Sequence, residues 1–269
     1  MLDIRAGSNV SSYYPRAVES SYYINAFLAY ANREYGISPE QVAFLTSICS
    51  DDLNSVGLPR TDMVGPFVQG GLNGFPFAGM TGLGAFSHHI PEPGAALMFF
   101  GPHVGITSDG QVGKVVRPGQ STPSDCCGAA AAALKALEAG TITHKEPCDY
   151  PVDDYQQETI RQIVLRHKDA ILGAGDVGDP RRFVVMTEAI YQETKDAFLR
   201  LLANTHFGSP AFFFGGILIN RDGRQESLIE LRDLDRVQHG KVQDLTSDFA
   251  QKAEERFRAF EAGDKNAFR

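Results

Sequence analysis

The chain has 269 residues, of which 43% are hydrophobic and 22% are charged. This length allows one large domain or two small ones with a substantial core, and the composition is ordinary for a soluble globular protein. The net charge of −8 argues against a nucleic-acid-binding protein, because no block of Lys and Arg could follow a phosphate backbone. It also argues against an anionic membrane surface as a partner.

The sequence shows no sign of membrane insertion or of a disulfide scaffold. No apolar run approaches the roughly 18 residues of a membrane span, and the N-terminal segment lacks the apolar stretch of a secretory signal. Four cysteines in a chain of this length do not suggest a disulfide framework, and adjacent cysteines rarely pair with each other. We therefore expect a soluble protein of a reducing compartment, either the cytoplasm or an organelle stroma, with no targeting segment.

The first half of the chain alternates between predicted helices and buried strands. Apolar residues at helical spacing predict a helix over 15–35, which Gly36 ends. A continuous apolar run predicts a strand over 41–49 that is covered on both faces. The glycine-rich segment 64–89 is expected to form loops and short turns. A second buried strand over 94–103 is followed by a hairpin that turns at Asp109 and Gly110.

The second half continues the same alternation. A helix over 123–140 has start signals at its first residues, an alanine-rich body and a stop at Gly140. Helices are also predicted near 154–168, 182–203 and 242–261, and strands over 210–220 and 225–234. Alternating strands and helices predict an α/β fold, with a central, mainly parallel sheet flanked by helices and antiparallel additions at its edge. We expect a single domain over residues 1–269.

Residues capable of zinc chemistry stand at the ends of three predicted elements. Cys49 ends one strand, His103 ends the next, and Cys126 and Cys127 lie in the first turn of a helix. In open α/β sheets, active residues gather where strands leave the sheet at their carboxyl ends. Two thiolates and one imidazole would bind zinc and leave a fourth position for water, the pattern of a catalytic site. The positive end of the helix would favour the thiolate.

The choice between the adjacent cysteines stays open in the sequence. Each cysteine taken alone could be a small buried hydrophobe. Residues Cys126 and Cys127 are about 100° apart on a helix, so only one of them is expected to face the end of the sheet. We favour Cys127, which directly precedes Gly128, where backbone can approach closely. Cys148 lies in a predicted loop without a partner at ligand spacing and is expected to be inert.

Two carboxylates follow the first cysteine. Asp51 lies two residues beyond Cys49 and could reach the open face of the metal. Paired with a guanidinium, it would be held aside and could accept a hydrogen bond from zinc-bound water. Arg60, in the same loop, is the nearest such cation. The alternative is an aspartate that caps local N–H groups, which suits Asp52 better than Asp51.

Longer stretches between residues 47 and 134 carry a resemblance to a known family. They read SICSDDLN, GPFVQGGLNGFPFAGMTGLGAFSHHIPE, GPHVGI with GQVGKVVRPGQ, and DCCGAAAAAL. In these stretches and their order, the sequence resembles the low-CO2-inducible protein B/C family, the theta-class carbonic anhydrases. The resemblance implies a homodimer with a β-carbonic-anhydrase-like fold and zinc bound by Cys49, His103 and Cys127. It implies Asp51 and Arg60 as the catalytic orienting pair, although the β-class spacings Cys-x-Asp-x-Arg and His-x-x-Cys do not occur here.

The implied activity is that of a carbonic anhydrase, a lyase that reversibly hydrates CO2 to bicarbonate in a CO2-concentrating mechanism. Zinc would lower the pKa of its bound water toward about 7 and so provide a hydroxide nucleophile. Phe75 and Phe77 could line an apolar pocket for CO2, although plain core positions are the more common use of phenylalanine. His88 and His89 could carry the proton away, although structural histidines are the stronger expectation.

Two other functions compete with the hydratase. The first is a binding or scaffold protein of inorganic-carbon uptake that keeps the fold, and perhaps the zinc, without turnover. The second is a zinc hydrolase of an ester or amide, which lacks support because no H-E-x-x-H motif is present.

Overall fold

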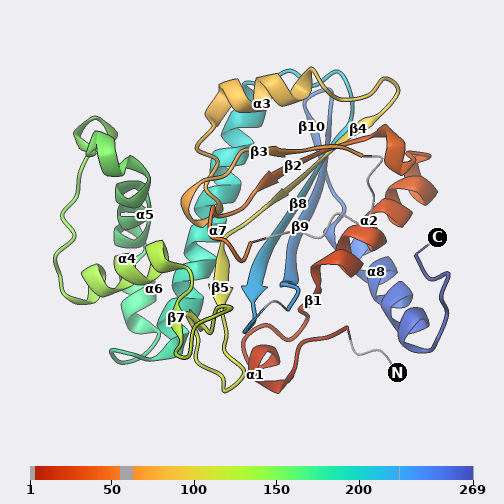
Figure 1. Ribbon diagram of the computed structural model, residues 1–269. Helices are drawn as coiled ribbons and strands as arrows, with labels where there is room; N and C mark the ends of the chain where they lie inside the picture. Colours follow the sequence, from red (N-terminus) through yellow and green to blue (C-terminus); the bar gives the residue numbers. More distant parts are fainter. Residues whose placement is uncertain (1–3, 55–62, 224, 269) are drawn as a thin grey trace.

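A twisted central sheet organises the molecule (Figure 1), and the computed structural model describes residues 4–54, 63–223 and 225–268. The strand order is β1-β9-β8-β4-β2-β3, with β10 beside β9 and β5 beside β8. The strands are β1 (Val18–Glu19), β2 (Val42–Ser47), β3 (Val64–Val68), β4 (Ala95–Phe100), β5 (His103–Gly105), β8 (Ala211–Asn220), β9 (Leu228–Gln238) and β10 (Lys241–Asp244). A separate two-stranded sheet pairs β6 (Lys114–Val115) with β7 (Ser124–Asp125).

Strand directions confirm the predicted α/β class. Strands β3, β2, β4 and β8 are parallel neighbours, and β5 also pairs with β8 in parallel. Strand β9 is antiparallel to β8, and β1 and β10 add to β9 in antiparallel pairs. Parallel strands are covered on both faces, which explains why β2, β4 and β8 read as unbroken apolar runs and are buried throughout.

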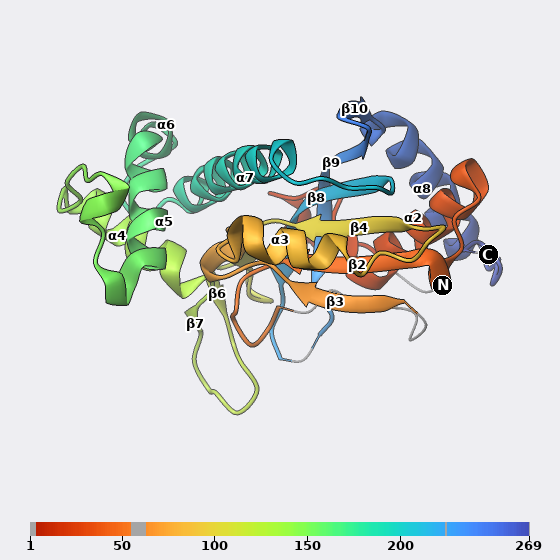
Figure 2. The same cartoon turned by 90° about the horizontal axis from the view of Figure 1, so that it is seen from above.

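Helices cover both faces of the sheet (Figures 1 and 2). They are α1 (Ser8–Ser11), α2 (Ser20–Tyr35), α3 (Gly79–Ser87), α4 (Gly128–Glu138), α5 (Tyr155–Arg166), α6 (Lys168–Gly173), α7 (Pro180–Ala203) and α8 (Thr246–Glu261). Alternate strand residues point to opposite faces. Phe44 therefore packs in one core cluster with residues of α2 and α8, whereas its neighbour Leu45 packs in another with residues of α3 and α7. None of the described helices is long and apolar enough to cross a membrane.

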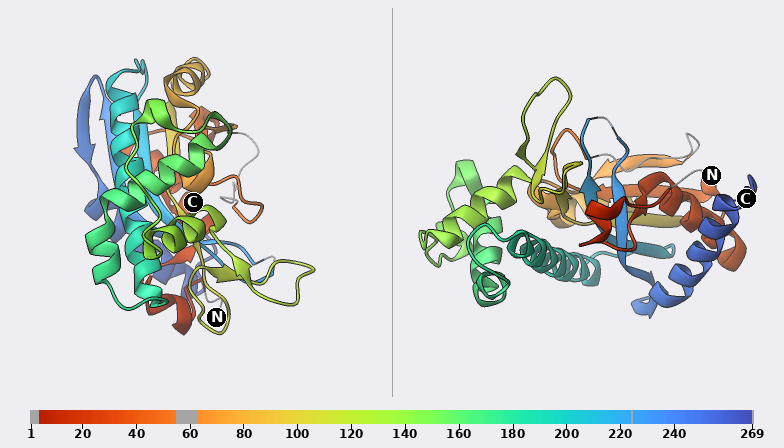
Figure 3. Two further views of the ribbon diagram at one scale, coloured as in Figure 1. Left: turned by 90° about the vertical axis from the view of Figure 1, so that its left-hand side faces the viewer. Right: turned by 90° about the horizontal axis from the view of Figure 1, so that it is seen from below.

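A third core cluster lies where β5 and the end of β8 meet helices α4 to α7. It joins Val104 and Ile219 of the strands to buried residues of these helices, and it includes Cys49 and Cys127. Figure 1 shows α4, α5 and α6 gathered beside the sheet, and Figure 3 shows the loop between β6 and β7 extending away from them. This cluster places two of the predicted ligands in an apolar setting.

The prediction of loops across segment 64–89 was wrong in part. The segment contains the edge strand β3 and the helix α3, with a short 3-10 helix, Leu72–Gly74, between them. Strand β3 is exposed at the sheet edge, where Gly65 and Pro66 are tolerated. In α3, Leu83 and Phe86 are fully buried, and this packing outweighs the low helix propensity of its glycines.

Two other predicted boundaries also differ. The strand predicted over 94–103 ends at Phe100, and His103 begins the separate strand β5. Gly101 approaches β8 so closely that an added Cβ would lie 1.7 Å from the carbonyl oxygen of Gly216, and Pro102 has no N–H to continue a ladder. The last helix begins at Thr246, because residues 241–244 pair with β9 as β10.

Candidate metal centre

The cysteine and histidine side chains come from three separate segments of the chain and lie close together. Strands β2 and β4 are in parallel register, with Ser47 opposite Phe100, so the segments that carry Cys49 and His103 leave the sheet at the same edge. The backbone of Cys126 accepts a bond from Gly105 N at 2.7 Å and donates one to Gly113 O at 2.9 Å. These bonds fasten the start of α4 beside β5.

Cys49, His103 and Cys127 converge as the sequence predicts, and all three are buried. Their ligand atoms lie within 4.8 Å of one another, and the two sulfur atoms are 3.9 Å apart. Tetrahedral zinc with Zn–S bonds of about 2.3 Å would separate its sulfurs by about 3.8 Å. His103 Nε2 is buried without a hydrogen-bond partner among the described residues. An orphaned imidazole nitrogen beside two thiols fits a zinc ion.

A hydrogen bond between the two thiols shifts their pKa values in opposite directions. That bond, together with His103, lowers the pKa of Cys49 to about 4 despite the opposing effect of burial. The same bond and burial raise the pKa of Cys127. Metal binding would release any proton left on either thiol, because a thiolate is the metal ligand.

Both adjacent cysteines lie just before helix α4, and the prediction that they share its first turn was wrong. Cys127 is the N-cap residue with extended backbone, φ −75° and ψ 135°, so the helical spacing argument does not apply to the pair. Cys127 reaches Cys49, whereas Cys126 Sγ lies 3.6 Å from His103 Nδ1 and 3.3 Å from Asn220 Oδ1. Cys126 thus belongs to the opposite side of the imidazole ring.

A second possible ligand set comprises Asp51, His103 and Cys126, whose ligand atoms also lie within 4.8 Å of one another. However, His103 Nδ1 is already bonded to Asn220 Oδ1 at 2.6 Å, whereas Nε2 is without a partner. The free nitrogen favours the set that contains Cys49 and Cys127. Exposed Cys148 is a free thiol that belongs to neither set.

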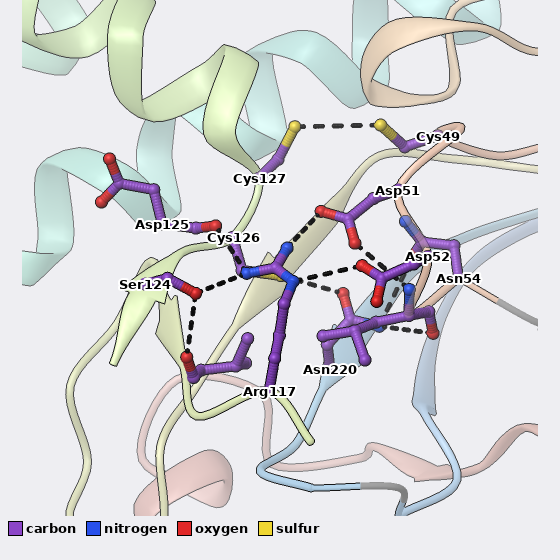
Figure 4. A network of polar contacts seen from close by, with 12 residues as sticks. Cys49, Asp51, Asp52, Asn54, Arg117, Ser124, Asp125, Cys126, Cys127 and Asn220 are labelled. Atoms are coloured by element: carbon purple, nitrogen blue, oxygen red, sulfur yellow. Dashed lines mark hydrogen bonds and ion pairs between the residues drawn. The ribbon is translucent and has the colours of Figure 1, made fainter. Parts of the chain in front are cut away.

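Asp51 has an arginine partner that sequence reasoning missed. Arg117 Nη2 donates to Asp51 Oδ2 at 2.7 Å, and Arg117 Nε donates to Asp52 Oδ1 at 3.1 Å (Figure 4). Ser124 Oγ also accepts from this guanidinium, at 2.7 Å. Arg60, the predicted partner, lies outside the described residues. Arg117 stands within the stretch GQVGKVVRPGQ, which carries the family resemblance, but no local spacing links it to Asp51.

Asp51 both pairs with an arginine and caps a local N–H group, so the expectation that capping suits Asp52 better was wrong. Asp51 Oδ1 accepts a hydrogen bond from Leu53 N at 3.2 Å, whereas the exposed Asp52 pairs with Arg117. Burial acts to raise the pKa of Asp51. The hydrogen bond with Asp52, the charge of His103, the Leu53 N–H and the charge of Arg117 together lower it below its usual value. Asp51 is therefore held as an ionised acceptor.

The aromatic and histidine candidates lie around this centre in different ways. Phe75 is half-buried and packs on the core cluster that includes Cys49 and Cys127, and its ring lies 5.0 Å from that of Phe77. This arrangement places apolar surface beside the thiols. His88 and His89 are exposed at the end of α3, and the ring Nδ1 of His89 bonds Ala85 O at 2.8 Å.

Comparison with known proteins gives one family and several similar folds. The family model described as limiting CO2-inducible proteins B/C beta carbonic anhydrases matches residues 20–239. The crystal structure of PtLCIB4, a homolog of the limiting CO2-inducible protein LCIB, is similar with 25% identity and a TM-score of 0.73, over 88% of this chain and 98% of that chain. The crystal structure of LCIB itself has 17% identity and a TM-score of 0.67, over 89% and 98% of the two chains, a likeness of fold. No protein of curated function matches the sequence.

Proposed function

Because the chain belongs to the limiting CO2-inducible protein B/C family of β-carbonic-anhydrase-like proteins, we propose that it reversibly hydrates CO2 to bicarbonate. We propose zinc as its metal, with Cys49, His103 and Cys127 as ligands. The observation that carries the proposal is a buried His103 with a ring nitrogen within 4.8 Å of the sulfurs of two thiols and an Nε2 that has no partner among the described residues. Bound zinc would act as a Lewis acid that makes hydroxide available from water at neutral pH.

Asp51 and Arg117 are the proposed orienting pair. The carboxylate of Asp51 has an oxygen within 4.8 Å of a His103 ligand atom, close enough to accept a hydrogen bond from a water at the centre. Its other contacts, to Arg117 and Leu53 N, hold it in one orientation. A carboxylate fixed in this way directs the lone pair of the attacking oxygen toward the substrate. The guanidinium would also keep Asp51 from binding a metal held by Cys49, His103 and Cys127.

The substrate needs only a small apolar surface, because CO2 carries no net charge. Half-buried Leu72 and Phe75 pack against the core cluster of Cys49 and Cys127 and supply such a surface. Weak apolar binding of the substrate is consistent with fast exchange at the site.

The test is stopped-flow CO2 hydration by the zinc-loaded protein beside Cys49→Ala and Asp51→Ala. We expect Cys49→Ala to lose zinc and activity, and Asp51→Ala to keep zinc and lose about 100-fold or more in kcat, the usual contribution of proton handling. Cys148→Ser, at an exposed position, serves as the matched cysteine control. If the wild-type protein binds one zinc but hydrates no CO2, the proposed enzymatic function is refuted. The remaining function would be that of a binding or scaffold protein in carbon uptake.

We also propose a homodimer, as the family resemblance implies. Exposed apolar residues support a contact surface near the sheet edge, where Val68 of β3 is 70% exposed and Met80 of α3 is 52% exposed. Light scattering after size exclusion tests this assembly. Residence in a reducing compartment remains a prediction, in keeping with four free cysteines.

A further inference from the structure

Asn220 is the last residue of β8, and its side chain is buried beside the candidate metal centre. One side of its amide faces His103 and Cys126, and the other side faces the segment that follows Cys49. The amide therefore connects the imidazole to the loop that carries Asp51. Figure 4 shows Asn220 next to Asn54 of that loop. Nothing in the carbonic anhydrase chemistry proposed above uses this residue directly.

The surroundings of Asn220 determine which way its amide points. Asn220 Nδ2 lies 3.2 Å from Leu53 O and 3.0 Å from Ser227 Oγ. A backbone carbonyl can only accept a hydrogen bond, so the NH2 group must face Leu53. The amide oxygen Oδ1 of Asn220 then points toward His103 and lies 2.6 Å from His103 Nδ1. Reversing the amide would bring two acceptors together at Leu53.

This orientation in turn decides the proton on the imidazole. Because Asn220 Oδ1 can only accept, His103 Nδ1 must carry the hydrogen of their shared bond. A metal binds only the neutral ring, whose lone pair would then be on Nε2, the nitrogen that has no partner in the described structure. We propose that Asn220 is the positioning residue that selects this tautomer and presents His103 Nε2 to the metal. The inference rests on the metal site proposed above.

The same amide also links the ring to the orienting carboxylate. Asn220 Nδ2 bonds Leu53 O, and Leu53 N bonds Asp51 Oδ1 at 3.2 Å. A change at Asn220 would thus loosen both the imidazole and the Asp51 turn. Partners that fix a ligating histidine typically change metal affinity by 10- to 100-fold when they are removed.

Two variants separate the acceptor role from simple packing. Asn220→Leu has similar size and no polar atom, whereas Asn220→Asp keeps an oxygen for the Nδ1 hydrogen and loses the donor. Ser227→Ala is the matched control, because it removes one partner of Asn220 Nδ2 and leaves the contact with His103. Zinc affinity is measured by chelator competition. The hydrogen on His103 Nδ1 is followed by proton NMR of metal-free protein with 15N-labelled histidine.

We expect the wild type to show a downfield, exchange-protected resonance coupled to His103 Nδ1. Asn220→Leu should lose this resonance and bind zinc 10- to 100-fold more weakly, whereas Asn220→Asp should keep it and bind zinc within about tenfold of the wild type. Ser227→Ala should keep the resonance and bind zinc within about threefold. A wild type without a protected Nδ1 hydrogen overturns the inference, as does an Asn220→Leu protein with unchanged zinc affinity.

The NMR measurement also distinguishes this inference from the proposed function. If the wild type binds no zinc or hydrates no CO2, the proposed function fails, yet the resonance on the metal-free wild type still decides the role of Asn220. This measurement needs no substitution and therefore holds even if Asn220→Leu does not fold. If zinc binds and CO2 is hydrated but the resonance is absent, only the role of Asn220 is refuted.

Discussion

Arg117 Nη2 donates a hydrogen bond to Asp51 Oδ2 over 2.7 Å, although the two residues are 66 positions apart in the chain. The side chains are 17% and 12% exposed, so this ion pair is largely withdrawn from water. Ser124 Oγ and the carbonyl of Asp125 hold the far side of the guanidinium. The partner of the proposed catalytic carboxylate therefore comes from the loop beside β6 and β7, and its position depends on the start of α4.

Replacement of Arg117 by alanine should lower kcat by tenfold or more without removing zinc. Asp51 would lose the contact that orients it, and its pKa would rise because the nearby positive charge is gone. Asp51 acts as an acceptor only when ionised, so the acid limb of the pH–rate profile should move to higher pH. Stopped-flow assays across pH and zinc analysis measure both effects.

Asp52→Asn is the control for this change, because it removes the exposed carboxylate that shares the same arginine. Exposed ion pairs contribute about 0–1 kcal/mol, so the control should stay within about fivefold of the wild type. Equal losses in Arg117→Ala and Asp52→Asn would contradict a specific role for the Asp51 contact.

Substitution of single cysteines should identify the ligands. Cys49→Ser and Cys127→Ser should each abolish stoichiometric zinc, because their thiols lie 3.9 Å apart beside His103, whose Nε2 has no partner among the described residues. Cys126→Ser should retain one zinc per chain, since its sulfur lies at the Nδ1 side of His103. Elemental analysis after dialysis gives the zinc content. Loss of zinc in Cys126→Ser with retention in Cys127→Ser would favour the alternative set with Asp51.

Stability should depend strongly on the aromatic core under α2 and α8. Phe214 is fully buried and packs against the rings of Tyr23, Phe27 and Phe249. We expect Phe214→Ala to lower the free energy of unfolding by about 3–5 kcal/mol, the usual cost of removing a buried phenylalanine. Urea unfolding measures this loss. Val152→Ala, at a residue that is 92% exposed, should change stability by no more than about 0.5 kcal/mol.

Acid should destabilise the protein partly through Glu158. Burial acts to raise the pKa of this carboxyl, but hydrogen bonds from Gln162 and Lys145 and the charge of Lys145 lower it below its ordinary value of 4.5. A pKa lowered in the folded state adds stability above the unfolded value, and that stability is lost as the pH falls through the folded pKa. The affected window therefore lies from about pH 5 downward.

Unfolding of the wild type and Glu158→Gln at pH 7 and pH 3.5 tests this dependence. The variant should be less stable at pH 7, and the difference should shrink at pH 3.5. The matched control is Glu255→Gln, on an exposed face of α8. A difference that stays constant with pH would show that Glu158 acts through packing alone.

Local patterns in the sequence predicted the main elements well. Unbroken apolar runs identified β2, β4 and β8, because strands covered on both faces bury every residue. The stop at Gly36 is confirmed by its left-handed conformation, with φ 66°. The helix α3 was not predicted, because its glycines have low helix propensity. Packing of the buried residues Leu83 and Phe86 stabilises it instead.

The sequence by itself determined the α/β class and the residue types of a possible metal centre at element ends. Burial and helix propensity are local properties, and they leave a periodic record along the chain. Only the tertiary structure decided that Arg117 pairs with Asp51, and that Asn220 faces His103 across 117 positions. The order of strands and the closure of loops set these contacts. No local periodicity encodes which distant polar side chains meet.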